Sequence, residues 1–94
     1  MREKLIEQNL VQTVRRMGGL APKFTSPGWA GVPDRLVLLP GGRLAFVEVK
    51  APGQRPRPVQ VRRKGQLEAL GFRVYVIDRP EQIPAILHEG GDAQ

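Results

Sequence analysis

The sequence predicts an α/β protein in which a mixed β-sheet is flanked by helices. Apolar residues recur at helical spacing over residues 2–17, and residues 59–70 form a second helical segment. Three short apolar runs, at residues 35–39, 44–50 and 73–77, predict strands. Because a helix joins the second run to the third, those two strands can lie parallel, whereas a short turn pairs the first two as an antiparallel hairpin.

The first helix, residues 2–17, is expected to end at the glycine pair 18–19. Residues 20–25 are expected to form a short strand, which makes the element order helix, three strands, helix, strand. Residues 26–33 (SPGWAGVP) predict an irregular loop, because two prolines and two glycines fall within this segment of eight residues.

A tight turn at residues 40–42 (PGG) joins the first two long apolar runs into a β-hairpin. Residues 51–58 form a loop rich in proline, glycine and arginine. The second helix is expected to end at Gly71, just before the last strand. Pro84 falls within residues 81–88, so at most a short helix is expected there.

A chain of 94 residues has room for one domain, expected over residues 1–88, with residues 89–94 as a flexible tail. The chain has no cysteine, which excludes a disulfide scaffold, a thiolate zinc site and a cysteine nucleophile. The longest apolar runs are about four residues, far short of the ~20 that span a bilayer. No signal peptide is visible, so we expect a cytoplasmic protein without membrane segments.

Positive charge is concentrated in one part of the chain. Lysine and arginine total 15 against nine acidic residues, for a net charge of +6, and residues 50–64 alone carry six cations and no acid. A local cluster of this kind is typical of a nucleic-acid-binding surface, and the alternative is a solvated, solubilising face. We refer to five of these cations as the basic stripe: Arg55, Arg57, Arg62, Arg63 and Lys64.

Two acids and a lysine are expected to meet at one end of the hairpin. Glu48 and Lys50 lie on the same face of their strand by alternation, and Asp34, at the start of the preceding strand, falls opposite residues 48–49. An acid inside an apolar strand is costly unless it is paired or binds a cation. Two carboxylates with open positions suit Mg²⁺, and the alternative is a turn cap beside a surface ion pair.

Residues 31–35 (GVPDR) and 46–53 (FVEVKAPG), followed by Gln60, resemble the VRR-NUC domain, a nuclease branch of the PD-(D/E)xK superfamily. The resemblance covers residues 3–78. It implies a restriction-endonuclease-like core with αβββαβ order and metal-dependent hydrolysis of phosphodiester bonds. Stand-alone members of the family occur in phages and bacteria, are similar to Holliday-junction resolvases and act as homodimers.

The resemblance also implies roles for individual residues. Asp34, Glu48 and the backbone carbonyl of Val49 become metal ligands, Lys50 becomes the catalytic lysine, and Gln60 lies at the edge of the active site. The expected metal is Mg²⁺, with Mn²⁺ able to substitute.

The family also uses a glutamate on the first helix, and here Glu3 and Glu7 compete for that role. We prefer Glu7 as a metal ligand because it lies closer to the packed face, where Leu10 follows one turn later. The alternative for Glu7 is an acid favoured at a helix start by the macrodipole.

Together these observations predict a metal-dependent, structure-specific DNA endonuclease. The preference for four-way junctions rests on the resemblance alone, which also implies a homodimer. The alternatives are a nuclease of flaps or single strands and, from another class, a catalytically silent nucleic-acid-binding module.

Overall fold

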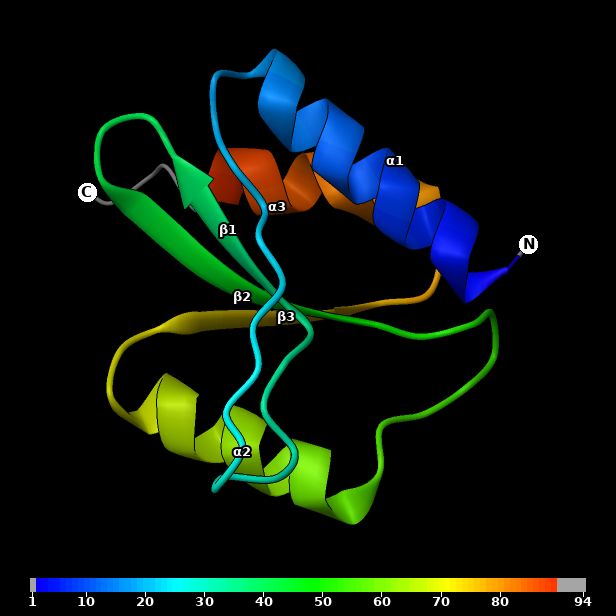
Figure 1. Ribbon diagram of the computed structural model, residues 1–94, viewed down its shortest axis with the longest axis vertical. Coiled ribbons are helices and arrows are strands. Elements are labelled where there is room, and N and C mark those ends of the chain that lie inside the picture. Colours follow the sequence, from blue (N-terminus) through cyan, green and yellow to red (C-terminus); the bar gives the residue numbers. More distant parts are fainter. Residues whose placement is uncertain (1, 90–94) are drawn as a thin grey trace.

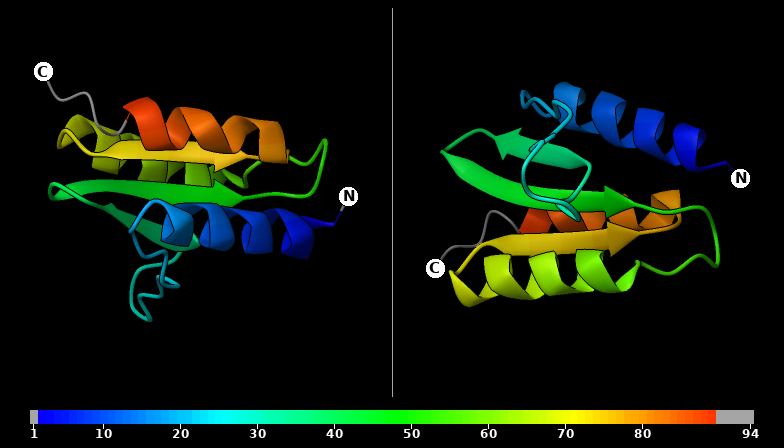
Figure 2. Two further views of the ribbon diagram at one scale, coloured as in Figure 1. Left: turned by 90° about the horizontal axis from the view of Figure 1, so that it is seen from above. Right: turned by 60° about the horizontal axis from the view of Figure 1, so that its bottom comes forward.

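The protein has three layers, with helices on both faces of a three-stranded sheet (Figure 1). The computed structural model describes residues 2–89. Its elements are α1 (Glu3–Arg16), β1 (Arg35–Leu39), β2 (Arg43–Val49), α2 (Pro58–Ala69), β3 (Arg73–Ile77), the 3-10 turn η1 (Pro80–Gln82) and α3 (Ile83–Glu89). Helices α1 and α3 cover one face of the sheet and α2 covers the other, as the views in Figures 1 and 2 both show. The predicted α/β class with flanking helices is confirmed.

The sheet is mixed, as predicted, with strand order β1-β2-β3. Strand β1 pairs antiparallel with β2, with Arg35 opposite Val47, and β2 pairs parallel with β3, with Val49 opposite Ile77. The start of β1 therefore meets the ends of β2 and β3 at one edge, which we call the carboxyl edge of the sheet. Strands β2 and β3 both run toward this edge, so the residues that directly follow each strand also lie there.

Residues 20–25 run along the outer side of β1 but do not form the expected strand. Leu20 and Leu38 exchange backbone hydrogen bonds of 2.9 and 2.8 Å, as in an antiparallel ladder. Two residues further on, Pro22 accepts a bond of 3.0 Å from the N–H of Leu36 but has no N–H to return. The ladder breaks there, so this part of the expected αβββαβ order is reduced to isolated bridges.

Alternation along β2 divides the core into two clusters. Ala45, Val47 and Val49 are fully buried against α1 and α3. Phe46 faces the other way and packs with Leu67 of α2 in a smaller cluster. The even-numbered positions of β2 thus face α2, and residue 48 is directed toward that side of the sheet.

The ends of the helices lie within a residue of their predicted positions, and the short C-terminal helix is also confirmed. Pro84 is tolerated because it is the second residue of α3, where its missing N–H has no partner to lose. Residue 89 belongs to α3, and the rest of the tail expected over 89–94 lies outside the described residues. No helix between residues 2 and 89 is both long enough and apolar enough to span a membrane.

Candidate active site

Asp34, Glu48 and Lys50 come together at the carboxyl edge of the sheet, as the hairpin register predicted. Extending the register of β1 and β2 places Asp34 opposite Glu48. The Asp34 Oδ2 atom accepts a hydrogen bond of 2.9 Å from the backbone N–H of Val49. The Lys50 Nζ lies 3.4 Å from Glu48 Oε2. Glu48 and Lys50 therefore form an ion pair, and Asp34 is bound to the backbone of the residue between them.

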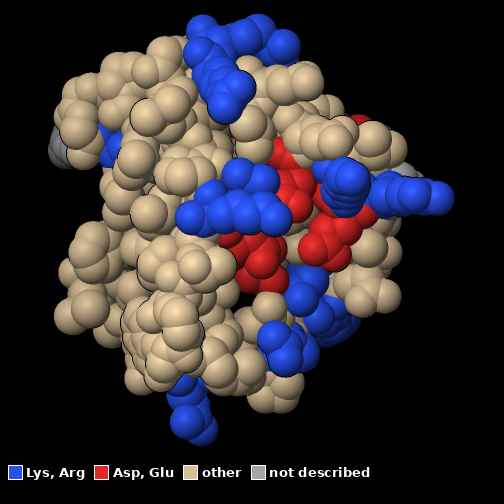
Figure 3. Space-filling model, in the orientation of Figure 1, with Lys and Arg blue, Asp and Glu red and all other residues tan. Residues whose placement is uncertain are grey.

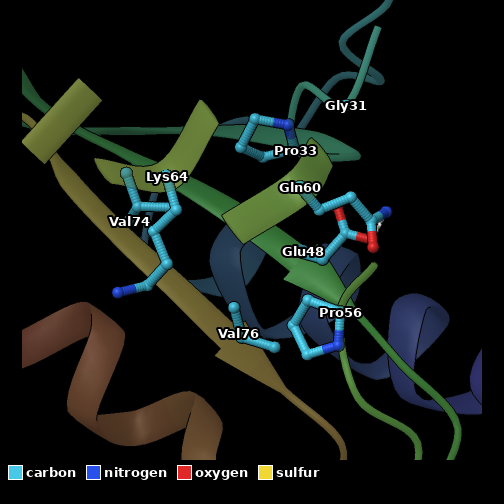
Figure 4. A pocket seen from close by; sticks show the side chains of 8 residues that line it. All are labelled: Gly31, Pro33, Glu48, Pro56, Gln60, Lys64, Val74 and Val76. Atoms are coloured by element: carbon cyan, nitrogen blue, oxygen red, sulfur yellow. Dashed lines mark hydrogen bonds between the residues drawn. The ribbon is translucent and has the colours of Figure 1, made fainter. Parts of the chain in front are cut away.

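Glu48 is the one buried charged residue in the described part of the chain, with 4% of its surface exposed. Its Oε2 atom accepts a hydrogen bond of 2.7 Å from the side-chain amide of Gln60. Its Oε1 atom is buried and has no hydrogen-bond partner. Figure 4 shows the carboxylate in a small pocket, and the apolar part of that pocket includes Pro33, Pro56 and Val76.

This environment raises the pKa of the Glu48 carboxyl above its usual value of 4.5. The main cause is burial, which disfavours the charged form, and the nearby negative charge of Asp34 adds to it. Lys50 and Gln60 oppose the shift, because both stabilise the carboxylate. A cation near the unpartnered oxygen would relieve both causes of the raised pKa.

Gln60 connects the start of α2 to the carboxylate. Its Oε1 atom accepts a hydrogen bond of 2.8 Å from the backbone N–H of Arg57, the residue before the helix. This bond fixes the orientation of the amide, so Nε2 is the atom that faces Glu48, as Figure 4 shows. Sequence reasoning placed Gln60 at the edge of the site but did not reveal this helix-capping bond.

The carbonyl of Val49 has an unusual neighbour. Extending the register of the hairpin places Pro33 opposite Val49, and proline has no N–H to donate. The N–H of Val49 is bound instead by Asp34. The pairing of β1 with β2 therefore ends at Val49, whose carbonyl receives no hydrogen bond from the backbone of Pro33. This carbonyl is the group that the resemblance implies as a metal ligand.

Glu7 lies half-buried on α1 and is held by Arg35. Its Oε2 atom accepts a hydrogen bond of 2.8 Å from Arg35 Nε, and Arg35 Nη1 donates a second bond of 2.8 Å to the carbonyl of Ala21. Alternation along the strand directs Arg35 away from Asp34. Sequence reasoning missed that the partner of Arg35 on that face is the proposed metal ligand Glu7.

The two acids of α1, Glu3 and Glu7, lie near Asp34. Glu3, Glu7 and Asp34 line a common cavity with a volume of about 300 Å³. Within residues 2–89, however, no group of three or more histidine, cysteine or acidic side chains is arranged to hold a metal ion. Asp34 and Glu48 thus form the carboxylate pair of the site, while Glu7 remains tied to Arg35 and Glu3 is exposed.

The five residues of the basic stripe differ in their surroundings. Arg55, Arg57 and Arg62 are exposed. The Arg63 guanidinium lies 5.1 Å from the centre of the Trp29 ring, and it also donates a hydrogen bond to Gln66. Lys64 forms an ion pair of 2.8 Å with Glu68. Two of the five cations therefore have partners within the chain, which the sequence alone did not reveal.

Gly31, in the GVPDR segment, has a backbone conformation that other residues rarely adopt. Its φ is +85°, and a Cβ atom at this position would lie 2.7 Å from the carbonyl oxygen of Val59, in the first turn of α2. The loop before Asp34 therefore packs directly on the helix that carries Gln60. Only glycine allows both the left-handed conformation and this approach.

We expect Gly31→Ala to destabilise the fold by about 1–2 kcal/mol from the left-handed backbone alone, with more from the contact with Val59. Gly28→Ala is the matched control in the same loop, because a Cβ there meets nothing within 4 Å and φ is not positive. Urea unfolding of both variants measures the difference. Equal free energies of unfolding would show that the loop does not pack on α2 as described.

The acidic side chains gather on one part of the face that Figure 3 shows. Figure 3 shows acidic side chains gathered in the middle of one face, with lysine and arginine side chains above and below them. Such an arrangement surrounds the acids with positive charge, which suits a polyanion that must reach them.

Comparisons with known proteins agree with this arrangement. No protein-family model matches the chain. The chain is 56% identical over 78 residues to the curated protein "Putative nuclease p44" of Acyrthosiphon pisum secondary endosymbiont phage 1, covering 83% of this chain and 84% of that protein. It also superposes on a solved structure described as a VRR_NUC domain, with a TM-score of 0.85 and 31% identity, over 90% of this chain and 92% of the other. Both likenesses extend over most of each chain, so they concern the whole fold.

Proposed function

This chain belongs to the VRR-NUC family and is a nuclease, and from that premise we propose that it hydrolyses phosphodiester bonds in DNA with the help of Mg²⁺. Asp34, Glu48 and the carbonyl of Val49 would hold the ion. The observation that carries this proposal is the Glu48 carboxylate, buried beside Asp34 with one oxygen unpartnered. A buried acid next to a second acid is unfavourable in a purely structural role, and a divalent cation removes the cost.

The donor set fits a hard cation. Mg²⁺ is bound in proteins by one or two carboxylates with the remaining positions left to water and phosphate oxygens. Asp34 and Glu48 supply the carboxylates and Val49 supplies a neutral oxygen, and neither sulfur nor imidazole is involved. Mn²⁺, which accepts the same oxygen ligands, is expected to substitute. The bound ion would polarise a phosphate oxygen and lower the pKa of a coordinated water.

The remaining residues act around that centre. Lys50, beside Glu48, is placed to orient the attacking water or to stabilise negative charge that develops on the phosphate. Gln60 keeps the Glu48 carboxylate in one orientation, because its own amide is fixed by the start of α2. The exposed cations of the basic stripe, Arg55, Arg57 and Arg62, are available to contact phosphates.

We further propose that the preferred substrate is a four-way DNA junction and that the active form is a homodimer. The support is the resemblance to junction resolvases together with a physical requirement: two symmetric cuts need two sites, and each chain has one. A two-fold dimer supplies sites related by the same symmetry as the junction. The competing possibility is a monomeric nuclease that acts on flaps or single strands.

The test is a cleavage assay on end-labelled four-way junction, flap, single strand and linear duplex, with Mg²⁺, Mn²⁺ or EDTA. We expect paired symmetric nicks in the junction only with a divalent cation, slow cleavage of linear duplex, and a dimer in sedimentation. Cleavage of flaps by a monomer that leaves junctions whole would favour the alternative. Cleavage that is equally fast in EDTA would contradict the metal site.

A further inference from the structure

A second groove in the described part of the chain lies beside the site and outside the basic stripe. It has a volume of about 530 Å³ and runs between α1 and residues 20–25. Its lining is polar and rich in nitrogen: Lys4, Arg15 and Lys23 contribute cations, and Gln8 and Gln12 contribute side-chain amides. We call it the α1 groove.

The three cations of the α1 groove are not engaged within the protein. None of the ion pairs or side-chain hydrogen bonds found among residues 2–89 involves Lys4, Arg15 or Lys23. The other charged pair in the groove, Glu7 and Arg35, is internally neutralised by its contact of 2.8 Å. The groove therefore carries an unbalanced charge of about three positive units, with amides beside it that can donate hydrogen bonds to anionic oxygens.

The α1 groove adjoins the cavity that Asp34 lines. Lys23 and Glu7 line both this groove and the neighbouring cavity that contains Asp34. Helix α1 covers the face of the sheet opposite to α2, so the groove and the basic stripe lie on two sides of the carboxyl edge. Figure 3 shows this pattern, with positive side chains on both sides of the central acids.

We propose that the α1 groove binds the phosphodiester backbone of the nucleic-acid substrate, on the side of the catalytic acids away from the basic stripe. This inference rests on the proposed function and adds to it a second phosphate-binding surface, formed by Lys4, Arg15 and Lys23. A polyanion that crosses the acids is then held on both sides of the scissile bond. Each phosphate contact releases counterions, so the groove contributes to affinity in a salt-dependent and sequence-independent way.

The test measures equilibrium binding of a labelled linear duplex and a labelled four-way junction in EDTA, over a series of salt concentrations. The first pair of variants is Arg15→Gln and Arg16→Gln, which remove equal charge from adjacent positions of α1, only the first of which lines the groove. The second pair is the double variant Lys4→Gln/Lys23→Gln and its control Arg16→Gln/Arg73→Gln. Circular dichroism and thermal melting verify that all four fold.

We expect Arg15→Gln to reduce the slope of log K against log salt by about one unit and the Lys4/Lys23 double variant to reduce it by about two. The controls should retain the slope of the wild-type protein. Equal slopes for the groove variants and their controls would overturn the proposal. If the wild-type protein still cleaves DNA with Mg²⁺ in that case, the proposed function stands and only the role of the α1 groove in binding is refuted. A wild-type protein that binds no nucleic acid would refute both proposals.

Discussion

Replacing Glu48 by glutamine is expected to reduce cleavage by roughly 10³-fold or more, the upper range for loss of a preorganised electrostatic group. The same change is expected to stabilise the metal-free protein at neutral pH. Both effects have one cause. The Glu48 carboxylate is buried beside Asp34 and has an unpartnered oxygen. This arrangement attracts a cation, and without a cation it destabilises the folded protein.

The effect of Glu48 on stability has a defined dependence on pH. Because its pKa in the folded protein is raised above 4.5, the folded state binds a proton more strongly than the unfolded state does. The stabilisation from that proton is fully present below pH 4.5 and is lost as pH rises through the higher pKa of the folded state. Glutamine remains neutral throughout, so the stability advantage of Glu48→Gln over the wild type should grow as pH increases from 4.5 toward neutrality.

Three measurements separate these effects. Thermal unfolding in EDTA, between pH 4.5 and neutral pH, gives the stability difference. Repeating the experiment with Mg²⁺ should raise the melting temperature of the wild type but not that of Glu48→Gln. Gel-shift assays should show DNA binding retained or tightened, because a negative charge has left a positive surface. Glu81→Gln, which neutralises an exposed acid that lines neither the Glu48 pocket nor the Asp34 cavity, controls for the loss of charge.

A Glu48→Gln protein that cleaves DNA at a rate near that of the wild type would contradict the metal-site assignment. A variant that is less stable than the wild type in EDTA at every pH would instead show that Glu48 has a structural role, in which its bonds to Lys50 and Gln60 outweigh the cost of burial.

The elements and the central site could be predicted from the sequence because both depend on local signals. Alternation along residues 44–50 fixes which side chains share a face, and the short turn fixes the hairpin register that brings Asp34 to Glu48. The expected strand at 20–25 failed for a local reason as well. Pro22 interrupts the ladder, and a proline in an edge segment that reads as a strand should have weakened that prediction.

The features that could not be predicted are contacts between segments far apart in the chain. Arg35 and Glu7 lie 28 positions apart, and their ion pair depends on how α1 crosses the sheet. The position of Arg63 over Trp29 likewise depends on how the loop at 26–33 packs on α2. Counting charges along the sequence treats every cation as free to bind phosphate, so Arg63 could not be told apart from the exposed residues of the basic stripe. The cations of the α1 groove are far apart in the sequence, so they form no cluster that such a count could detect.

Replacing Lys50 by methionine is expected to lower the single-turnover cleavage rate by about 10²-fold at saturating metal, as for loss of a preorganised charge at a transition state. The lysine cannot be a metal ligand, because its ammonium group donates hydrogen bonds only. Removing it should therefore leave the affinity for Mn²⁺ unchanged or higher, since a positive charge near the cation disappears. The fall in rate then arises from the chemical step and not from loss of the ion.

Lys50→Met should also change the pH dependence of cleavage in a predictable direction. Lys50 lowers the pKa of Glu48, in opposition to burial and Asp34. Without it, Glu48 retains its proton to a higher pH, so the acidic limb of the pH–rate profile should move to higher pH. A side chain that acts only by packing would not cause this displacement, because methionine fills a similar volume to the lysine stem.

Calorimetry of Mn²⁺ binding and single-turnover kinetics across pH, on the same protein preparations, test the role of Lys50. Lys50→Arg keeps the positive charge but changes its shape and reach, so it should restore the position of the acidic limb more fully than it restores the rate. Arg73→Gln controls for net charge, since it removes an exposed cation from the start of β3, away from the carboxyl edge. A Lys50→Met protein that binds Mn²⁺ poorly but cleaves at the wild-type rate once saturated would show that the lysine organises the metal site and takes no part in the chemical step.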